Sequence, residues 1–194
     1  MVIETKKIEA HWNYLLAIEN DLELISRYVD FDERNFDCFS IEISRLLMAS
    51  AAEVDVVCKR LCKKLNPDSS AEKIHHYRNE IKSAYLYIPS FGVFLPRYGL
   101  TLRPWSNWQK DDGVPDWWIA HNKIKHNRDS QFHRGNLKNA LNSVAGLFVM
   151  VLYLYKEKAE LGELLPSPTL LRPTEDHFGG STHGGYEFGI NYKL

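Results

Sequence analysis

Residues 125–133, with the sequence KHNRDSQFH, hold the side chains in this chain that are best suited to chemistry. Arg128 and His133 stand five positions apart, and Asp129 directly follows the arginine. The planar fork of an arginine can hold a phosphate, and a histidine can move protons near neutral pH. This pattern is typical of a site that cleaves phosphodiester bonds without a metal ion. Three neighbouring polar residues are expected to bind adjoining phosphates: Lys125, His126 and Asn127.

The spacing of Arg128 and His133 constrains the backbone between them. In one continuous α-helix the two side chains would point about 140° apart, so they could not reach one phosphate. A helix break at Asp129 or Ser130, both good N-cap residues, would bring them together, as would a site shared across a two-fold dimer. In the first arrangement His133 lies in the first turn of the next helix, where the helix dipole favours a neutral imidazole and attracts a phosphate. A neutral imidazole there could act as the base toward a ribose 2′-hydroxyl.

The length and composition are those of a single soluble domain. The chain has 194 residues, a hydrophobic fraction of 44% and a net charge of −1. Because the whole chain is not basic, any binding of a polyanion such as RNA must come from a local patch. The longest apolar run, 144–155, is shorter than the roughly 20 residues that span a bilayer, and the N-terminus lacks the apolar core of a signal peptide. We therefore expect a cytoplasmic protein without a membrane partner.

Apolar residues recur at three- and four-residue intervals along most of the chain, which predicts helices. Ser40 and Ser70 stand where N-caps of two of these helices are expected. The expected helices cover residues 5–28, 41–65, 70–87, 116–127 and 132–160. This order of helices and turns predicts an all-α bundle over residues 1–165.

The segment 88–116 interrupts this pattern with four prolines and three glycines. Residues 92–95 and 100–103 are expected to pair as a small hairpin. The segment carries Arg103 and Trp105, which could contact RNA by binding a phosphate and stacking on a base. The alternative is that its aromatic residues only cover the open end of the bundle.

Two further features concern the C-terminal part of the chain. The helical segment 136–160 is apolar on every side in its second half, which predicts the central helix of the bundle or a subunit interface. The tail, 166–194, contains two Gly-Gly pairs and few apolar residues. It is expected to be a loop-rich or disordered arm.

The run Arg128-Asp129-Ser130-Gln131-Phe132-His133, set after several helices and before a long apolar helix, resembles the R-x(4–6)-H motif of the HEPN superfamily. The resemblance implies an all-helical fold and a metal-independent endoribonuclease without a cofactor, in which Arg128 and His133 are catalytic and Asp129 orients them. It also implies a homodimer, here expected to form through residues 136–160, and a role in defence or as a toxin that an antitoxin protein restrains.

Other interpretations of the same residues remain open. Arg128 could pair with Asp129 or Glu80 in a purely structural turn. A cation could be held by His126 and His133 with Asp129 or Ser130 between them and Asn122 one turn earlier. It could instead be held by His177 and His183 of the tail, or by Cys58 and Cys62 with His75 and His76. The chain could also be a non-catalytic helical dimer that binds RNA or another protein.

Overall fold

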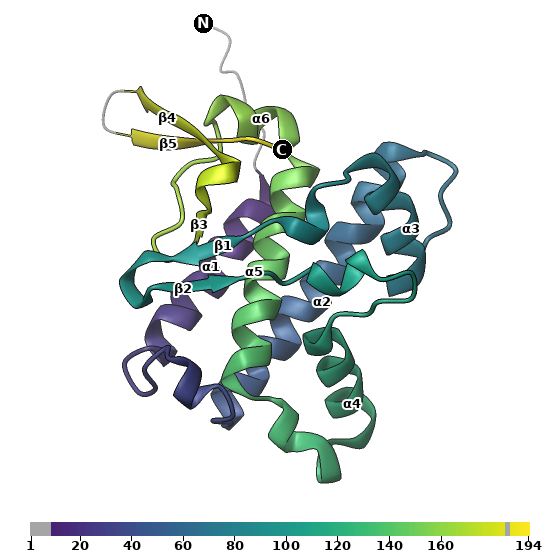
Figure 1. Ribbon diagram of the computed structural model, residues 1–194, viewed down its shortest axis with the longest axis vertical. Coiled ribbons are helices and arrows are strands. Elements are labelled where there is room, and N and C mark those ends of the chain that lie inside the picture. Colours follow the sequence, from purple (N-terminus) through teal and green to yellow (C-terminus); the bar gives the residue numbers. More distant parts are fainter. Residues whose placement is uncertain (1–8, 185–186) are drawn as a thin grey trace, which may run out of the picture.

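The computed structural model describes residues 9–184 and 187–194, and within them are six α-helices, one of which, α5, lies at the centre of the others (Figure 1). The helices are α1 (Ala10–Ile25), α2 (Ile41–Leu65), α3 (Ile74–Ala84), α4 (Asp116–Gln131), α5 (Leu137–Leu154) and α6 (Lys156–Leu161). The prediction for α2 is confirmed at both ends, and Ser40 caps it by accepting a hydrogen bond from the Ile43 N–H at 3.2 Å. Residues 5–8 of the expected first helix lie outside the described residues.

Helices α1 and α3 end earlier than predicted, at Ile25 and Ala84, whereas α4 begins at Asp116 as predicted and extends past its expected end at 127 to Gln131. Helix α3 begins at Ile74 and has no side-chain cap, so the expected capping role of Ser70 is wrong. The expected helix 132–160 is divided between α5 and α6, and Asn136 caps α5 by accepting from the Asn139 N–H at 3.1 Å. Local hydrogen bonding at the termini therefore decided where these helices start and stop.

Helix α5 is the centre of the fold, with fifteen of its residues buried. It packs along α2. Within this apolar contact the Ser50 hydroxyl donates a hydrogen bond to the Ser143 hydroxyl at 2.7 Å. By length and composition α5 could cross a membrane, but 83% of it is buried inside the fold. The helix is therefore covered by its own chain, as the core helix of a soluble protein is.

The prediction of an all-α fold is wrong, because two small antiparallel sheets accompany the helices. The first sheet has the order β2-β1-β3, with β1 (Val93–Leu95), β2 (Leu100–Leu102) and β3 (Arg172–Pro173). The second is the hairpin of β4 (Phe178–Gly184) and β5 (Glu187–Tyr192). The expected hairpin in the segment 88–116 is confirmed as β1 and β2, which turn at Gly99 with a left-handed φ of 63°.

The expectation of a loop-rich or disordered C-terminal tail is also wrong. Strand β3 pairs with β1, so the tail completes the sheet that the 88–116 segment begins. Strand β5 packs on α6, and the β4–β5 hairpin lies at the end of the molecule that carries α6 (Figure 1). Gly185, within the second Gly-Gly pair, lies outside the described residues. Strand β3 could not be predicted from periodicity, because its partner strand lies 80 residues earlier in the sequence.

A buried carboxylate anchors the tail to the helices. Glu19 of α1 is 1% exposed, and its two oxygens accept the backbone N–H groups of Thr169, Leu170 and Leu171 at 2.8–2.9 Å. A buried charge is tolerated only where such donors surround it. Glu19 thereby fixes the tail immediately before it enters the first sheet as β3.

The tryptophans of the 88–116 segment form the cover over α5. Trp105 and Trp108 are fully buried, their ring centroids lie 4.3 Å apart, and Trp117 meets Trp105 edge-on at 5.2 Å. The Trp105 Nε1–H donates to the Gly146 carbonyl of α5 at 3.2 Å, and a side chain larger than hydrogen at Gly146 would press on Trp117. The aromatic residues of this segment therefore close the bundle.

Replacing Glu19 with alanine is expected to lower the free energy of unfolding by about 3 kcal/mol, because buried backbone donors lose their acceptor and each unmatched donor costs about 1–3 kcal/mol. Urea denaturation measures the change. The matched control on the same helix is Glu23→Ala, whose carboxylate makes only a partly exposed 3.8 Å contact with Arg97. The control should cost less than about 1 kcal/mol. Equal losses in both variants would contradict the anchoring role.

Candidate functional site

The predicted phosphate-cleaving run lies at the corner where α4 meets α5, at one end of the molecule (Figure 1). The helical conformation breaks at Asn127, with φ −140° and ψ 49°, and a 3-10 turn over Phe132–Arg134 follows α4. A break in this run was predicted, but at Asp129 or Ser130, so its expected position is wrong. Residues 127–134 form this corner.

The placement of His133 in the first turn of the long helix is wrong as well. Helix α5 begins at Leu137 behind its cap Asn136, whereas His133 lies in the preceding 3-10 turn. The reason is tertiary: the chain between the two helices is bound to the segment before α2. The Leu137 N–H donates to the Cys38 carbonyl at 2.8 Å, and Gly135 lies so close to Ser44 that no side chain fits there.

The side chains that carry the predicted chemistry face solvent. Arg128, Asp129 and His133 are all exposed. The Arg128 guanidinium lies over the Phe132 ring, 5.4 Å from its centroid, and Phe132 in turn meets Phe39 edge-on at 6.0 Å. None of the ion pairs found among the described residues joins Arg128 to Asp129 or to Glu80. Its guanidinium donors are thus available to an anion. In a purely structural turn they would instead be paired with a carboxylate.

The corner sits within a strongly basic stretch of an otherwise balanced chain. Between positions 123 and 138 there are five lysines and arginines and a single acidic residue, Asp129. The cationic residues are Lys123, Lys125, Arg128, Arg134 and Lys138. Only Arg134 among them is partly buried, and its Nε–H donates to the Gln131 side-chain oxygen at 2.5 Å. This stretch supplies the local positive patch that polyanion binding requires.

A pocket of about 690 Å³ opens beside this basic stretch, between α2, the start of α3 and α4. Helix α4 contributes the residues at positions i, i+3, i+4 and i+7, which share one helical face. These are Trp118, His121, Asn122 and Lys125. The facing wall consists of Met48, Ala52, Asp55, Lys59 and residues 72–75. Lys125 therefore belongs both to the predicted phosphate ligands and to this pocket.

His121 is the most unusual group in the pocket. It is 8% exposed, and its buried Nδ1 has no hydrogen-bond partner among the described residues. Burial lowers the pKa of His121, the positive charges of Lys125 and His126 lower it further, and the carboxylate of Asp55 opposes them. His121 is therefore a neutral imidazole at physiological pH, with a donor and an acceptor to offer.

Asp55 is held in place on the opposite wall. It accepts hydrogen bonds from the Tyr77 hydroxyl at 2.7 Å and from the Lys59 ammonium at 2.5 Å. Burial and the bond to Asp55 raise the pKa of Tyr77 well above its ordinary value, so the phenol stays protonated and keeps donating. The wall thus presents a fixed, partly neutralised carboxylate beside Lys59.

Of these pocket residues, Lys125 was predicted from the sequence, whereas His121 and Asp55 were not. The i, i+3, i+4, i+7 spacing of Trp118, His121, Asn122 and Lys125 is visible in the sequence and could have indicated a shared face. Asp55 could not have been found in this way, because it comes from a helix some 60 positions earlier. Only the packing of α2 against α4 brings the two walls together.

The two residues predicted from the 88–116 segment do not join the corner. Trp105 is fully buried under the tryptophan cover, so its ring has no free face for a base. Arg103 is exposed but lies next to the start of α4, because the adjacent Pro104 carbonyl accepts from the Trp117 Nε1–H at 2.9 Å. Arg128 is eleven residues farther along, or about 16 Å of helix axis.

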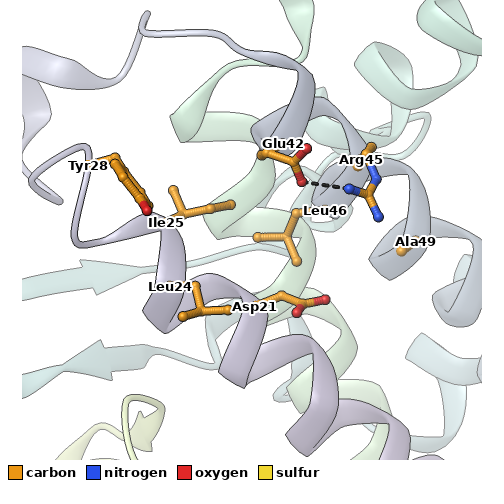
Figure 2. A pocket seen from close by; sticks show the side chains of 8 residues that line it. All are labelled: Asp21, Leu24, Ile25, Tyr28, Glu42, Arg45, Leu46 and Ala49. Carbon is orange, nitrogen blue, oxygen red and sulfur yellow. Dashed lines mark hydrogen bonds and ion pairs between the residues drawn. The ribbon is translucent and has the colours of Figure 1, made fainter.

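A second pocket, between α1 and α2, suits a polyanion less well (Figure 2). Figure 2 shows Leu24, Ile25 and Leu46 on its walls, with Arg45 paired to Glu42 at 2.7 Å. Its charged residues are two acids and this one paired arginine. The pocket has no excess of positive charge.

No cation site forms in the part of the chain that the structure describes, since no three His, Cys, Asp or Glu side chains gather there as ligands. Cys58 and Cys62 are buried in α2, and burial raises the pKa of Cys62 to about 12. Both thiols therefore pack as small apolar groups. The three alternative metal sites predicted from the sequence have no support in these ranges.

Comparison with protein-family models, with curated proteins and with solved structures finds no match to this chain. The resemblance to HEPN domains rests on the run 128–133 and on the order of the helices around it.

The buried imidazole should make stability depend on pH. The folded pKa of His121 lies below its ordinary value of 6.5, so the unfolded chain takes up the proton first as the pH falls. Stability is therefore retained above pH 6.5 and lost progressively as the pH drops below it. His121→Gln removes this loss, and urea denaturation at about pH 8 and about pH 5 measures it. If the wild type and the variant lose the same stability between the two pH values, the lowered pKa assigned to His121 is wrong.

Proposed function

We propose that the protein is an endoribonuclease that binds RNA on the basic stretch 123–138 and cleaves it at the corner without a metal ion. The observation that carries this proposal is the exposure of Arg128 and His133 on one basic corner, with the arginine free of any ion pair among the described residues. The backbone between the two residues supports it further: Gln131 leaves the helical conformation with φ −114° and ψ 8°, and His133 lies in the 3-10 turn that follows, so the two residues do not share one continuous helix that would direct their side chains apart.

The chemistry follows from the residue types. A histidine removes the proton from the ribose 2′-hydroxyl, the 2′-oxygen attacks the phosphorus, and the 5′-oxygen leaves with a proton from an acid. The Arg128 guanidinium stabilises the charge that develops on the phosphate oxygens. His133 takes part in proton transfer, Asp129 orients the pair, and Lys125 or His126 binds the next phosphate or protonates the leaving oxygen. The products carry 2′,3′-cyclic phosphate and 5′-hydroxyl ends.

The second function is a non-catalytic dimer that binds RNA or another protein. The specific observation in its favour is that Arg128, Asp129 and His133 are all exposed, whereas catalytic groups usually lie in a cavity. The two functions differ in a measurable way, because binding alone does not depend on an imidazole at position 133. Restraint by an antitoxin protein and a role in defence belong to the first function and stay predictions.

The dimer belongs to the proposal, but α5 does not offer its surface, since α5 is covered by its own chain. Exposed apolar residues instead adjoin the corner at the start of α2 and the end of α1. Ile41 is 61% exposed, Phe39 is 50% exposed beside Phe132, and Leu24 and Tyr28 border the pocket of Figure 2. Two-fold pairing through this apolar surface would bring two corners together and shield side chains that otherwise face water.

The catalytic assignment is tested by incubating a mixed RNA pool with purified protein in EDTA. The wild type should cut the RNA and leave 2′,3′-cyclic phosphate ends, and Arg128→Ala and His133→Ala should each reduce cleavage by at least about a hundredfold. Both residues are exposed, so neither substitution should unfold the protein.

Two matched control variants are measured in the same experiment. Arg97→Ala and His183→Ala remove an exposed arginine and an exposed histidine far from the corner, and both should cleave at the wild-type rate. Binding of RNA without cleavage by any of the variants or the wild type would favour the interaction module. Cleavage by His133→Ala at the wild-type rate would show that the site assignment is wrong.

The apolar surface is tested separately by light scattering after size-exclusion chromatography. The wild type should have twice the 22.5 kDa mass of one chain, and Ile41→Glu should have the mass of one chain, because a buried carboxylate at the contact is costly. Val56→Glu is the control on the same helix, since Val56 is also exposed but lies about 22 Å farther along α2. A wild-type protein with the mass of one chain, or a dimer insensitive to Ile41→Glu, would contradict this surface.

A further inference from the structure

The pocket between α2, α3 and α4 combines three features that seldom occur together by chance. One wall has small or flexible apolar side chains, Met48, Ala52 and Ile74, and lysines stand at its edges. A buried imidazole lacks a hydrogen-bond partner at Nδ1. Such a mixture suits a ligand with an apolar ring, polar ring atoms and a negative charge.

The charges around the pocket favour an anionic ligand. Lys59 already compensates Asp55 at 2.5 Å, which leaves Lys73 and Lys125 facing a single further acid, Glu72. Lys73 and Lys125 are both exposed, and neither takes part in an ion pair among the described residues. A phosphate bound near Lys125 would therefore contact an ammonium group that is not paired with a carboxylate.

The polar groups in the floor favour a heteroaromatic ring over a simple anion. His121 and Asn122 lie side by side on α4, and an amide and an imidazole together offer donors and acceptors to a base edge. His121 and Trp118 both line this pocket, and their ring centroids lie 5.7 Å apart. A volume of about 690 Å³ is within the range of pockets that hold ligands of this size.

We propose that this pocket binds one ribonucleotide unit, with its base between the Met48–Ile74 wall and the His121–Asn122 face and its phosphate at Lys125. This inference rests on the proposed function, in that the nucleotide belongs to the same RNA that crosses the corner. Lys125 lies three residues before Arg128, so a strand held in the pocket continues directly onto the basic corner. The pocket then selects the nucleotide next to the cleaved bond, and His121 and Asn122 read its base.

The test is calorimetric titration of the full chain in EDTA with each of the four ribonucleoside 5′-monophosphates and with inorganic phosphate. At least one mononucleotide should bind about tenfold or more tightly than phosphate, because the base adds contacts that phosphate lacks. Lys125→Ala and Asn122→Ala should each weaken that binding by about tenfold. Both residues are exposed, so the loss does not depend on the stability of a buried variant.

The matched control is Lys63→Ala, an exposed lysine on α2 that does not line the pocket and lies outside the basic stretch, and it should bind the nucleotide as the wild type does. Equal affinity for phosphate and for every mononucleotide, or no binding at all, would overturn the proposal.

Arg128→Ala separates this inference from the proposed function. It should abolish RNA cleavage and retain nucleotide binding. Cleavage by the wild type without nucleotide binding would overturn the pocket alone, and nucleotide binding without any cleavage would overturn the ribonuclease alone.

Discussion

The second half of helix α5 is apolar around its whole circumference, and the rest of the fold depends on covering it. Amphipathic helices such as α2 can cover one side each, but a helix without a polar face needs a cover on every side. Here α1, α2 and α4 supply part of it, and the tryptophan-rich segment 88–116 supplies the remainder, with Trp105 bonded to the backbone of α5 at Gly146. The sheet β2-β1-β3 holds this segment to the C-terminal part of the chain, because β1 and β2 belong to the segment and β3 to the tail.

The tail follows from this constraint. Strand β3 adds to the edge of β1, and the Glu19 carboxylate holds the three backbone N–H groups that precede it. The order of the tail comes from backbone pairing, from the bonds to Glu19 and from the few apolar side chains that it buries in the core, which are Leu170, Leu171, Ile190 and Tyr192. The chain thereby links its first helix, its middle segment and its last strands, which lie far apart in the sequence.

The candidate site is built on the outside of this core. The apolar face of α4 is fixed by Trp117 and Ile124, which leaves its polar residues on a solvent-facing side. The corner is then fixed by backbone bonds from the start of α5 to the segment before α2, and by the close approach of Gly135 to Ser44. A rigid core, an exposed basic corner and an adjoining pocket with a buried imidazole are what binding and cutting a flexible strand would require.

The sequence by itself determined the existence and order of the main helices, the limits of α2, the hairpin of β1 and β2, and the position of the basic run. Each of these depends on neighbours within a few residues: apolar spacing, the Ser40 cap, turn glycines and local charge. Tertiary structure decided the rest. It moved the start of α5 past His133, buried Trp105, turned the Gly-rich tail into strands and placed Asp55 opposite His121. These outcomes depend on contacts between residues tens of positions apart, which periodicity and capping cannot encode.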